Sequence, residues 1–220
     1  MIRLVCFDMD GVIFEKKNFW MELHKALGTY EKGKELTEKH LKKDYARLVE
    51  EVVAKLWKGK KADKYFELVR KTRYTKGAKA TVKELKKMGI KTAIISSGPK
   101  DLAVRAKKEL GIDFVFYNGL VIRDNKITGK FNWPIGHGTK EKIRIVKSLS
   151  QKLGISLQEV AFVGDNDNDV GVCKKVGLSI AFNSESKVLK KICDISIEGK
   201  DLTLVLRQNF YKRSPTLLKR

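Results

Sequence analysis

Two carboxylates one residue apart follow an apolar run near the start of the chain. Asp8 and Asp10 come after residues 2–7, whose apolar character is typical of a buried strand. Side chains alternate along a strand, so positions i and i+2 point the same way and bring the two acids together. Like charges at that spacing need a cation, and carboxylates and substrate phosphates are ligands that Mg2+ prefers. The pair predicts a Mg2+-dependent enzyme acting on phosphoryl groups.

Two later segments repeat this pattern of a strand followed by polar side chains. Ser96 follows the apolar run at 90–95, and Asp165 and Asp169 follow another at 159–163. In doubly wound sheets the ligand crevice lies beyond the carboxyl ends of the strands. We therefore expect these side chains to converge with the first acidic pair, where the later acids would complete a carboxylate cage for Mg2+.

The elements that must position these residues alternate between helix and strand from residue 75 onward. This alternation predicts an α/β fold: a doubly wound, mainly parallel sheet with helices on both faces. The expected helices are 78–88, 102–110 and 140–153, and the expected further strands are 114–117 and 178–182. A small hairpin of 120–122 with 126–128 is expected around Asp124 and Asn125. Residues 15–74 show only helical spacing, with glycines at the breaks. We predict a core domain of residues 1–14 and 75–220 and an inserted helical cap of residues 15–74.

Composition narrows the function classes. The 220 residues carry a net charge of +21, which invites a nucleic-acid hypothesis. Residues 15–74 hold +7 of this charge and the rest +14, so the excess is dispersed, and we do not expect a nucleic-acid partner. Three scattered cysteines argue against a disulfide framework and favour the cytoplasm. No stretch reaches the roughly 20 apolar residues that a membrane span needs.

Taken in order, the motifs resemble the haloacid dehalogenase superfamily of phosphatases, and most closely its phosphoserine phosphatase branch. That family has Asp-x-Asp after the first strand, Ser or Thr after a later strand, a downstream Lys, and an acidic Gly-Asp-x-x-x-Asp motif. The chain matches all four, with Lys140 as the downstream lysine after the loop 136–139. The resemblance covers nearly the whole chain and implies a Rossmann-like core with a cap.

The resemblance also implies a role for each matching residue. Asp8 would be the nucleophile that forms an aspartyl-phosphate, and Asp10 the general acid and base. The implied phosphate ligands are Ser96, Ser97, Lys140 and Asn168. The implied Mg2+ ligands are Asp8, Asp10, Asp165 and Asp169.

Some positions depart from the phosphoserine phosphatase pattern. In that branch Ser or Thr usually follows the second Asp, whereas this chain has Gly11. The cap acid and the cap Arg that receive the substrate amino acid in that branch would fall near Lys17 and Val52, and neither matches, although Glu15 or Arg47 could substitute. We therefore expect a Mg2+-dependent phosphatase of a small phosphorylated metabolite. The resemblance supports the general reaction more strongly than it supports specificity for phosphoserine. The alternative is a basic module on the same scaffold that binds nucleic acid or protein.

Overall fold

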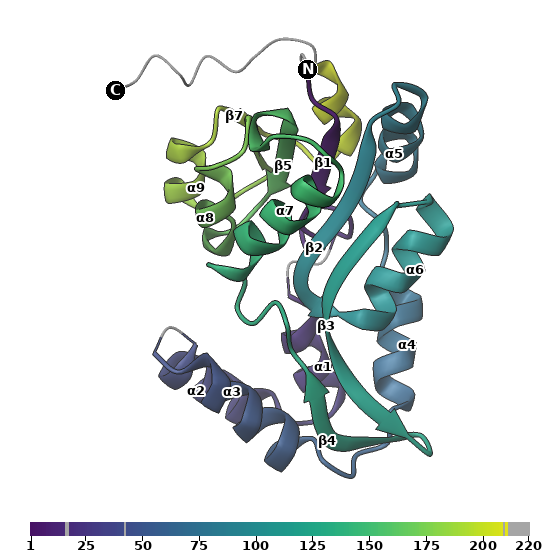
Figure 1. Cartoon of the computed structure of the whole chain (residues 1–220). Helices are drawn as coiled ribbons and strands as arrows, with labels where there is room; N and C mark the ends of the chain where they lie inside the picture. The colour runs from purple at the N-terminus through teal and green to yellow at the C-terminus, as the bar shows by residue number, and fades with distance from the viewer. Residues whose placement is uncertain (16–17, 42, 209, 211–220) are drawn as a thin grey trace.

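The computed structural model describes residues 1–15, 18–41, 43–208 and 210, and its centre is a twisted sheet (Figure 1). The strand order is β4-β3-β2-β1-β5-β6-β7, and every neighbouring pair is parallel except β3 with β4. The strands are β1 (Leu4–Phe7), β2 (Lys91–Pro99), β3 (Phe114–Arg123), β4 (Lys126–Asn132), β5 (Val160–Gly164), β6 (Leu178–Phe182) and β7 (Ile195–Ile197).

Helices cover both faces of this sheet. One face packs against α5 (Ala78–Lys87) and α6 (Lys100–Leu110), and the other against α7 (Glu141–Lys152), α8 (Val170–Cys173) and α9 (Lys187–Ile192) (Figure 1). Short 3-10 turns complete the chain: η2 (Leu157–Glu159), η3 (Asp167–Asp169) and η4 (Leu202–Arg207). The predicted doubly wound, mainly parallel α/β fold is confirmed.

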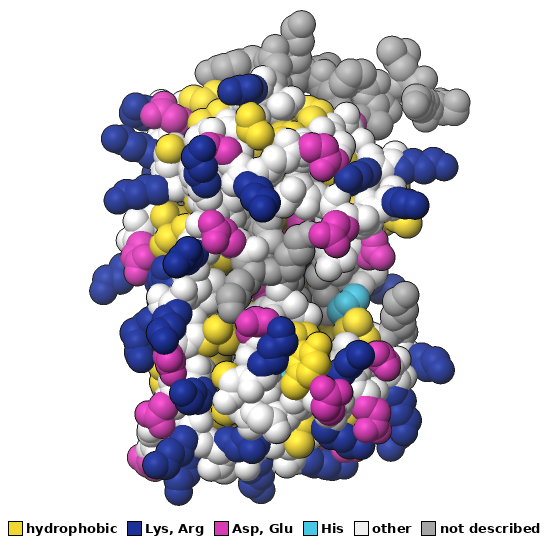
Figure 2. All heavy atoms as spheres, turned by 180° about the vertical axis from the view of Figure 1, so that it is seen from behind, with side chains coloured by type: hydrophobic (Ala, Val, Ile, Leu, Met, Phe, Trp, Pro, Cys, Tyr) yellow, Lys and Arg dark blue, Asp and Glu magenta, His cyan; other side chains and the backbone are white. Residues whose placement is uncertain are grey.

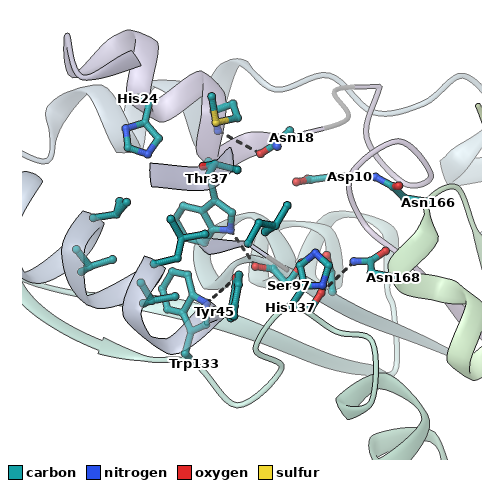
Figure 3. A pocket seen from close by; sticks show the side chains of 18 of the residues that line it. Asp10, Asn18, His24, Thr37, Tyr45, Ser97, Trp133, His137, Asn166 and Asn168 are labelled. Atoms are coloured by element: carbon teal, nitrogen blue, oxygen red, sulfur yellow. Dashed lines mark hydrogen bonds between the residues drawn. The ribbon is translucent and has the colours of Figure 1, made fainter. Parts of the chain in front are cut away.

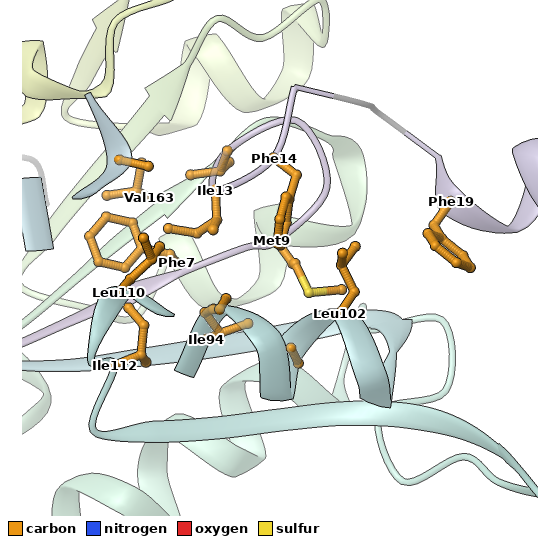
Figure 4. Packing of buried hydrophobic residues seen from close by; sticks show 14 of the residues in the cluster. Phe7, Met9, Ile13, Phe14, Phe19, Ile94, Leu102, Leu110, Ile112 and Val163 are labelled. Atoms are coloured by element: carbon orange, nitrogen blue, oxygen red, sulfur yellow. The ribbon is translucent and has the colours of Figure 1, made fainter. Parts of the chain in front are cut away.

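The alternation of side chains along the central strands creates two separate hydrophobic cores. Val5 and Phe7 of β1 belong to the core under α5 and α6, whereas Leu4 and Cys6 belong to the core under α7. Figure 4 shows Phe7 in the first core, with Ile94 and Val163 from the neighbouring strands. Since all four β1 side chains are fully buried, the end of this strand is held rigidly from both sides.

The described part of residues 15–74 is helical and lies beyond the carboxyl ends of the strands (Figure 1). Its elements are α1 (Phe19–Ala26), α2 (Tyr30–His40), α3 (Tyr45–Val49), the π-helix η1 (Glu50–Leu56) and α4 (Asp63–Lys71). The β3–β4 hairpin reaches out to this segment, where the Gly59 N–H donates to the Ile127 carbonyl at 2.8 Å. The division into core and cap domains stays a prediction.

The hairpin itself is longer than the sequence pattern indicated. Asp124 and Asn125 form its turn with φ of 47° and 54°, as a two-residue primed turn requires. The predicted strand at 114–117 and the first hairpin strand at 120–122 are one continuous strand, β3. The carboxyl half of β3 therefore leaves the parallel sheet and pairs only with β4.

Two linkers connect the core to the helical segment, and they run side by side. The Thr75 N–H donates to the Ile13 carbonyl at 2.9 Å, and the rings of Phe14 and Tyr74 stack with centroids 4.6 Å apart. Arg105 of α6 places its guanidinium 4.7 Å from the Tyr74 ring centroid. The same side chain donates to the Val69 carbonyl at 2.6 Å, so α6 fixes the end of α4.

Candidate active site

The structure brings together polar residues from the carboxyl ends of three neighbouring strands. Asp8 follows β1, Ser96 lies in β2, and Asp165 follows β5, and these strands are adjacent in the sheet. All three side chains are buried and line a single cavity of about 200 Å³. The predicted convergence at the carboxyl edge of the sheet is confirmed.

A buried carboxylate cluster forms the floor of this site. Asp8, Asp165 and Asp169 each offer an oxygen within 4.8 Å of the others. Burial raises the pKa of Asp165 well above its ordinary value, and the charges of Asp8 and Asp169 raise it further. Burial likewise raises the pKa of Asp169 to about 6, although Lys142 opposes that shift. Three buried carboxylates this close together carry more negative charge than Lys142, the one cation in contact with them among the described residues, can balance.

That cluster fits a divalent metal ion. The donors are carboxylate oxygens, which suit a hard cation such as Mg2+. Asp169 accepts from Lys142 through one oxygen and from the Asp165 N–H through the other, so both its oxygens are engaged. Asp8 is held in the same way, since its Oδ1 accepts from the Met9 N–H at 2.7 Å and its Oδ2 lies 2.8 Å from Nζ of Lys142. These contacts fix both carboxylates in position on either side of Lys142. Among the described residues the side chain of Asp10 stands outside this cluster.

Lys142 supplies the positive charge of the site. Its Nζ lies 2.8 Å from Oδ2 of Asp8 and 2.7 Å from Oδ1 of Asp169, and the side chain is completely buried. Burial alone would lower the pKa of Lys142, but the charges of Asp169 and Asp8 raise it above its ordinary value. Lys142 is therefore charged at neutral pH and compensates two carboxylates.

Lys140, the lysine predicted from the sequence, does not reach the cluster. It is the residue before α7, its side chain is exposed, and its N–H donates to Glu141. Residue 142 lies about 200° further around the helix, at 100° per residue, and so points into the core. The sequence motif placed the lysine at the correct end of the correct helix but on the wrong face.

Asp10 faces the start of the helical segment. Its Oδ2 accepts from the Phe19 N–H at 3.0 Å, and within the described chain its Oδ1 is buried without a hydrogen-bond partner. Burial raises the pKa of Asp10 to about 7, the Phe19 N–H lowers it and the charge of Asp8 raises it. A carboxyl group with this pKa can both give and take a proton near neutral pH.

The remaining predicted residues also lie at the cavity. The Ser96 hydroxyl accepts from the Gly98 N–H at 3.1 Å, which keeps it at the end of β2. Ser97 and Asn168 line the cavity, and Asn168 is tied to the His137 carbonyl at 3.2 Å. Its Oδ1 is buried and has no partner in the described chain, so it can receive a donor from a ligand or from water.

Gly11 makes the close approach of two loops possible. It adopts φ of 79°, in the left-handed region, and a Cβ atom there would collide with the Asp165 carboxylate. The departure from the family pattern at this position is thus compatible with the site. A side chain at residue 11 would push the loops after β1 and β5 apart.

The wall opposite the carboxylates comes from the helical segment and the hairpin (Figure 3). Trp20 of α1 donates its indole N–H to the Ser97 carbonyl at 2.9 Å, and its ring lies 4.9 Å from that of Trp133. Trp133 in turn donates to the Tyr45 hydroxyl at 3.0 Å. Val52, the position expected for a cap Arg, also lines the cavity, whereas Lys17 lies outside the described residues.

Comparison with known proteins agrees with this geometry. A family model for haloacid dehalogenase-like hydrolases matches residues 2–177. The chain belongs to the haloacid dehalogenase-like hydrolases. This assignment confirms the resemblance that the motifs indicated. No helix in the described parts of this hydrolase is long and apolar enough to cross a membrane.

Among other members of this hydrolase family, the chain is similar to phosphoserine phosphatases. It is 36% identical over 202 residues to that of Archaeoglobus fulgidus, an alignment that covers 91% of this chain and 58% of that protein. It is 32% identical over 210 residues to the phosphoserine phosphatase of Methanocaldococcus jannaschii, and this alignment covers 93% of this chain and 96% of that protein. The chain therefore spans little more than half the length of the first relative and nearly all of the second.

Solved structures of this hydrolase family give the same result. A phospho-aspartyl intermediate analogue of phosphoserine phosphatase superimposes with a TM-score of 0.82 and 30% identity, covering 94% of this chain and 98% of that one. A substrate-bound phosphoserine phosphatase complex matches with the same TM-score, identity and coverage. The sheet, its helices and the helical segment of this chain thus have the arrangement of a phosphatase fold.

Proposed function

We propose that the protein is a Mg2+-dependent phosphatase that hydrolyses a small phosphomonoester through an aspartyl-phosphate on Asp8. The carboxylate of Asp8 would attack phosphorus, and the ester oxygen would leave. Water would then attack the phosphoryl group and release phosphate. The observation that carries the proposal is the buried cluster of Asp8, Asp165 and Asp169 around Lys142, at the carboxyl edge of the sheet.

Asp10 is suited to the proton transfers of both steps. As a neutral acid it would protonate the departing alkoxide, and as a carboxylate it would take a proton from the attacking water. A pKa of about 7, which results mainly from burial, permits both forms at neutral pH. The hydrogen bond from Phe19 ties its orientation to the position of α1, so the acid would be set when the helical segment is seated.

The phosphoryl oxygens would be held by Ser96, Ser97 and Asn168, which line the same cavity. Lys142 would hold the Asp8 carboxylate in place and add positive charge near the developing negative charge. Mg2+ bound by Asp8 and Asp165 would stabilise the charge on the phosphoryl group.

The cytoplasm is the proposed compartment, supported by three cysteines that are all free.

Hydrolysis of a panel of phosphomonoesters, with and without Mg2+, tests this function. The expected result is phosphate release that needs both Mg2+ and Asp8, so that Asp8→Asn is inactive under saturating Mg2+. The matched control is Asp124→Asn, which makes the same change at an exposed hairpin turn. Phosphate release by Asp8→Asn at the wild-type rate would refute the proposal.

A further inference from the structure

The cavity has two chemically different ends. The phosphate end carries the carboxylates Asp8, Asp10 and Asp165. The other end is aromatic and aliphatic. Its largest members are three tryptophans and a tyrosine of α3, with apolar neighbours from the C-cap of α2 and from η1. These are Trp20, Trp57, Trp133, Tyr45, Leu41 and Val52.

The aromatic end lies directly next to the position proposed for the phosphoryl group. Trp20 donates its indole N–H to the Ser97 carbonyl at 2.9 Å, and its ring centroid lies 6.1 Å from that of Trp57 and 4.9 Å from that of Trp133. The indole N–H groups of Trp20 and Trp133 are both used in these hydrogen bonds. The parts of these two rings that line the cavity therefore present apolar surface, rather than a hydrogen-bond donor, to a ligand.

Among the residues that the structure describes, this end has no Lys, Arg, Asp or Glu side chain. Within the described chain the cavity lining contains no Lys, Arg or Glu, and its only acids are those of the phosphate end. His24 is held neutral, because burial lowers its pKa to about 4. An ammonium and a carboxylate on the leaving group would lose hydration without gaining ionic partners here, which is costly.

We propose that the natural substrate is a phosphomonoester whose leaving alcohol bears an uncharged aromatic or apolar group, rather than a zwitterionic amino acid. This inference rests on the proposed phosphatase function and specifies its substrate class. The leaving group stacks against Trp20 and Trp133 while the phosphoryl group lies at Asp8.

The test compares kcat/KM for 2-phenylethyl phosphate, ethyl phosphate and O-phosphoserine with saturating Mg2+. The first two have similar leaving alcohols and differ by the phenyl ring, whose burial is expected to give a preference of about 10- to 100-fold. We expect 2-phenylethyl phosphate to exceed O-phosphoserine as well. A kcat/KM for O-phosphoserine equal to or above that for 2-phenylethyl phosphate overturns the inference and leaves the phosphatase proposal standing. If none of the three is hydrolysed, the phosphatase proposal itself fails.

A pair of variants tests whether the preference for the phenyl substrate arises at the aromatic end of the cavity. Trp133→Leu is expected to reduce the ratio of kcat/KM for 2-phenylethyl phosphate to that for ethyl phosphate by about 10-fold, because one stacking surface is lost. Phe66→Leu makes a similar change in α4, outside the cavity lining, and is expected to keep the wild-type ratio. If Trp133→Leu folds and keeps the wild-type ratio, the inference is contradicted. If this variant does not fold, the comparison of the three substrates with the wild-type protein decides the inference.

Discussion

Lys142 lies between Asp8 and Asp169 at hydrogen-bond distance from both, with no exposed surface. Removing its charge would leave two buried carboxylates without their partner and release the Asp8 side chain from its position. We predict that Lys142→Met lowers kcat by at least about 100-fold. The measurement is steady-state hydrolysis of the preferred substrate, with circular dichroism to verify that the variant is folded.

The matched control is Lys140→Met, two residues earlier in an exposed position. We expect it to retain kcat within about twofold, because exposed charges contribute little. A larger loss in Lys140→Met than in Lys142→Met would contradict the positions that the structure gives to these two lysines.

The burial of His24 is expected to make the free energy of unfolding depend on pH. This histidine is buried in α1, its Nδ1 lies 2.8 Å from the Thr29 hydroxyl, and burial lowers its pKa from 6.5 to about 4. The unfolded chain therefore takes up the proton first as the pH falls, so stability is lost between about pH 6.5 and pH 4. We predict that wild type loses on the order of 1 kcal/mol more than His24→Gln over this range. Urea unfolding at both pH values checks this, and parallel pH profiles for the two proteins would count against it.

The residues found from the sequence share one signal. Asp8, Ser96 and Asp165 each stand at or just past the end of an apolar run, so the expectation of a parallel sheet was enough to bring them together. Lys142 had no such signal, since lysines are abundant in this chain and the face of a helix depends on its first residue. The aromatic end of the cavity was not predicted, because the helical spacing of Trp20, Tyr45 and Val52 is equally typical of a helical segment's own core.

At the scale of elements, Arg105 couples α6 to both linkers. It donates to the Val69 carbonyl at 2.6 Å and the Thr72 carbonyl at 2.8 Å, and its guanidinium lies over Phe14 and Tyr74. We predict that Arg105→Met costs about 2 kcal/mol of unfolding free energy, since two carbonyls and two rings lose their partner.

Urea denaturation of Arg105→Met and of a control variant measures this contribution. The control is Arg70→Met, an exposed arginine at the end of α4, which should change stability by less than about 0.5 kcal/mol. Equal effects of the two substitutions would show that α6 does not secure the linkers.

Long periodic elements were predictable and short ones were not. The pattern identified β1, β5, β6 and the helices α5 to α7, because apolar periodicity over several residues is a strong signal. Strand β7 has three residues and α8 has four, too few for a period to be visible. The length of β3 also escaped prediction, because Asn118 and Gly119 in its middle are typical of a turn.

At the scale of the whole molecule, the distribution of charge can be followed on the face opposite to the view of Figure 1. Figure 2 shows Lys and Arg side chains distributed over that face with Asp and Glu between them. Several exposed lysines are paired within helices, such as Lys55 with Glu51 at 2.7 Å and Lys71 with Glu67 at 2.7 Å. A surface of this kind explains a net charge of +21 without a nucleic-acid site.

Metal binding should appear as a change in the stability of the entire protein. A ligand that binds only the folded state raises the unfolding temperature as its concentration increases. We predict that Mg2+ raises the thermal midpoint at constant ionic strength, by relieving the repulsion among Asp8, Asp165 and Asp169. Differential scanning fluorimetry follows this, and Asp165→Asn should abolish the Mg2+-dependent part. An unchanged midpoint in wild type across millimolar Mg2+ would argue against a metal at this cluster.

Trapping the covalent intermediate tests the central claim most directly. The protein is mixed with a hydrolysable phosphomonoester and Mg2+, quenched in acid after a single turnover, digested and analysed by mass spectrometry. The peptide that contains Asp8 is expected to carry one phosphoryl group, and Asp10→Asn should increase its amount by slowing the attack of water. A phosphoryl group on another residue, or turnover by Asp8→Asn at the wild-type rate, would contradict the account.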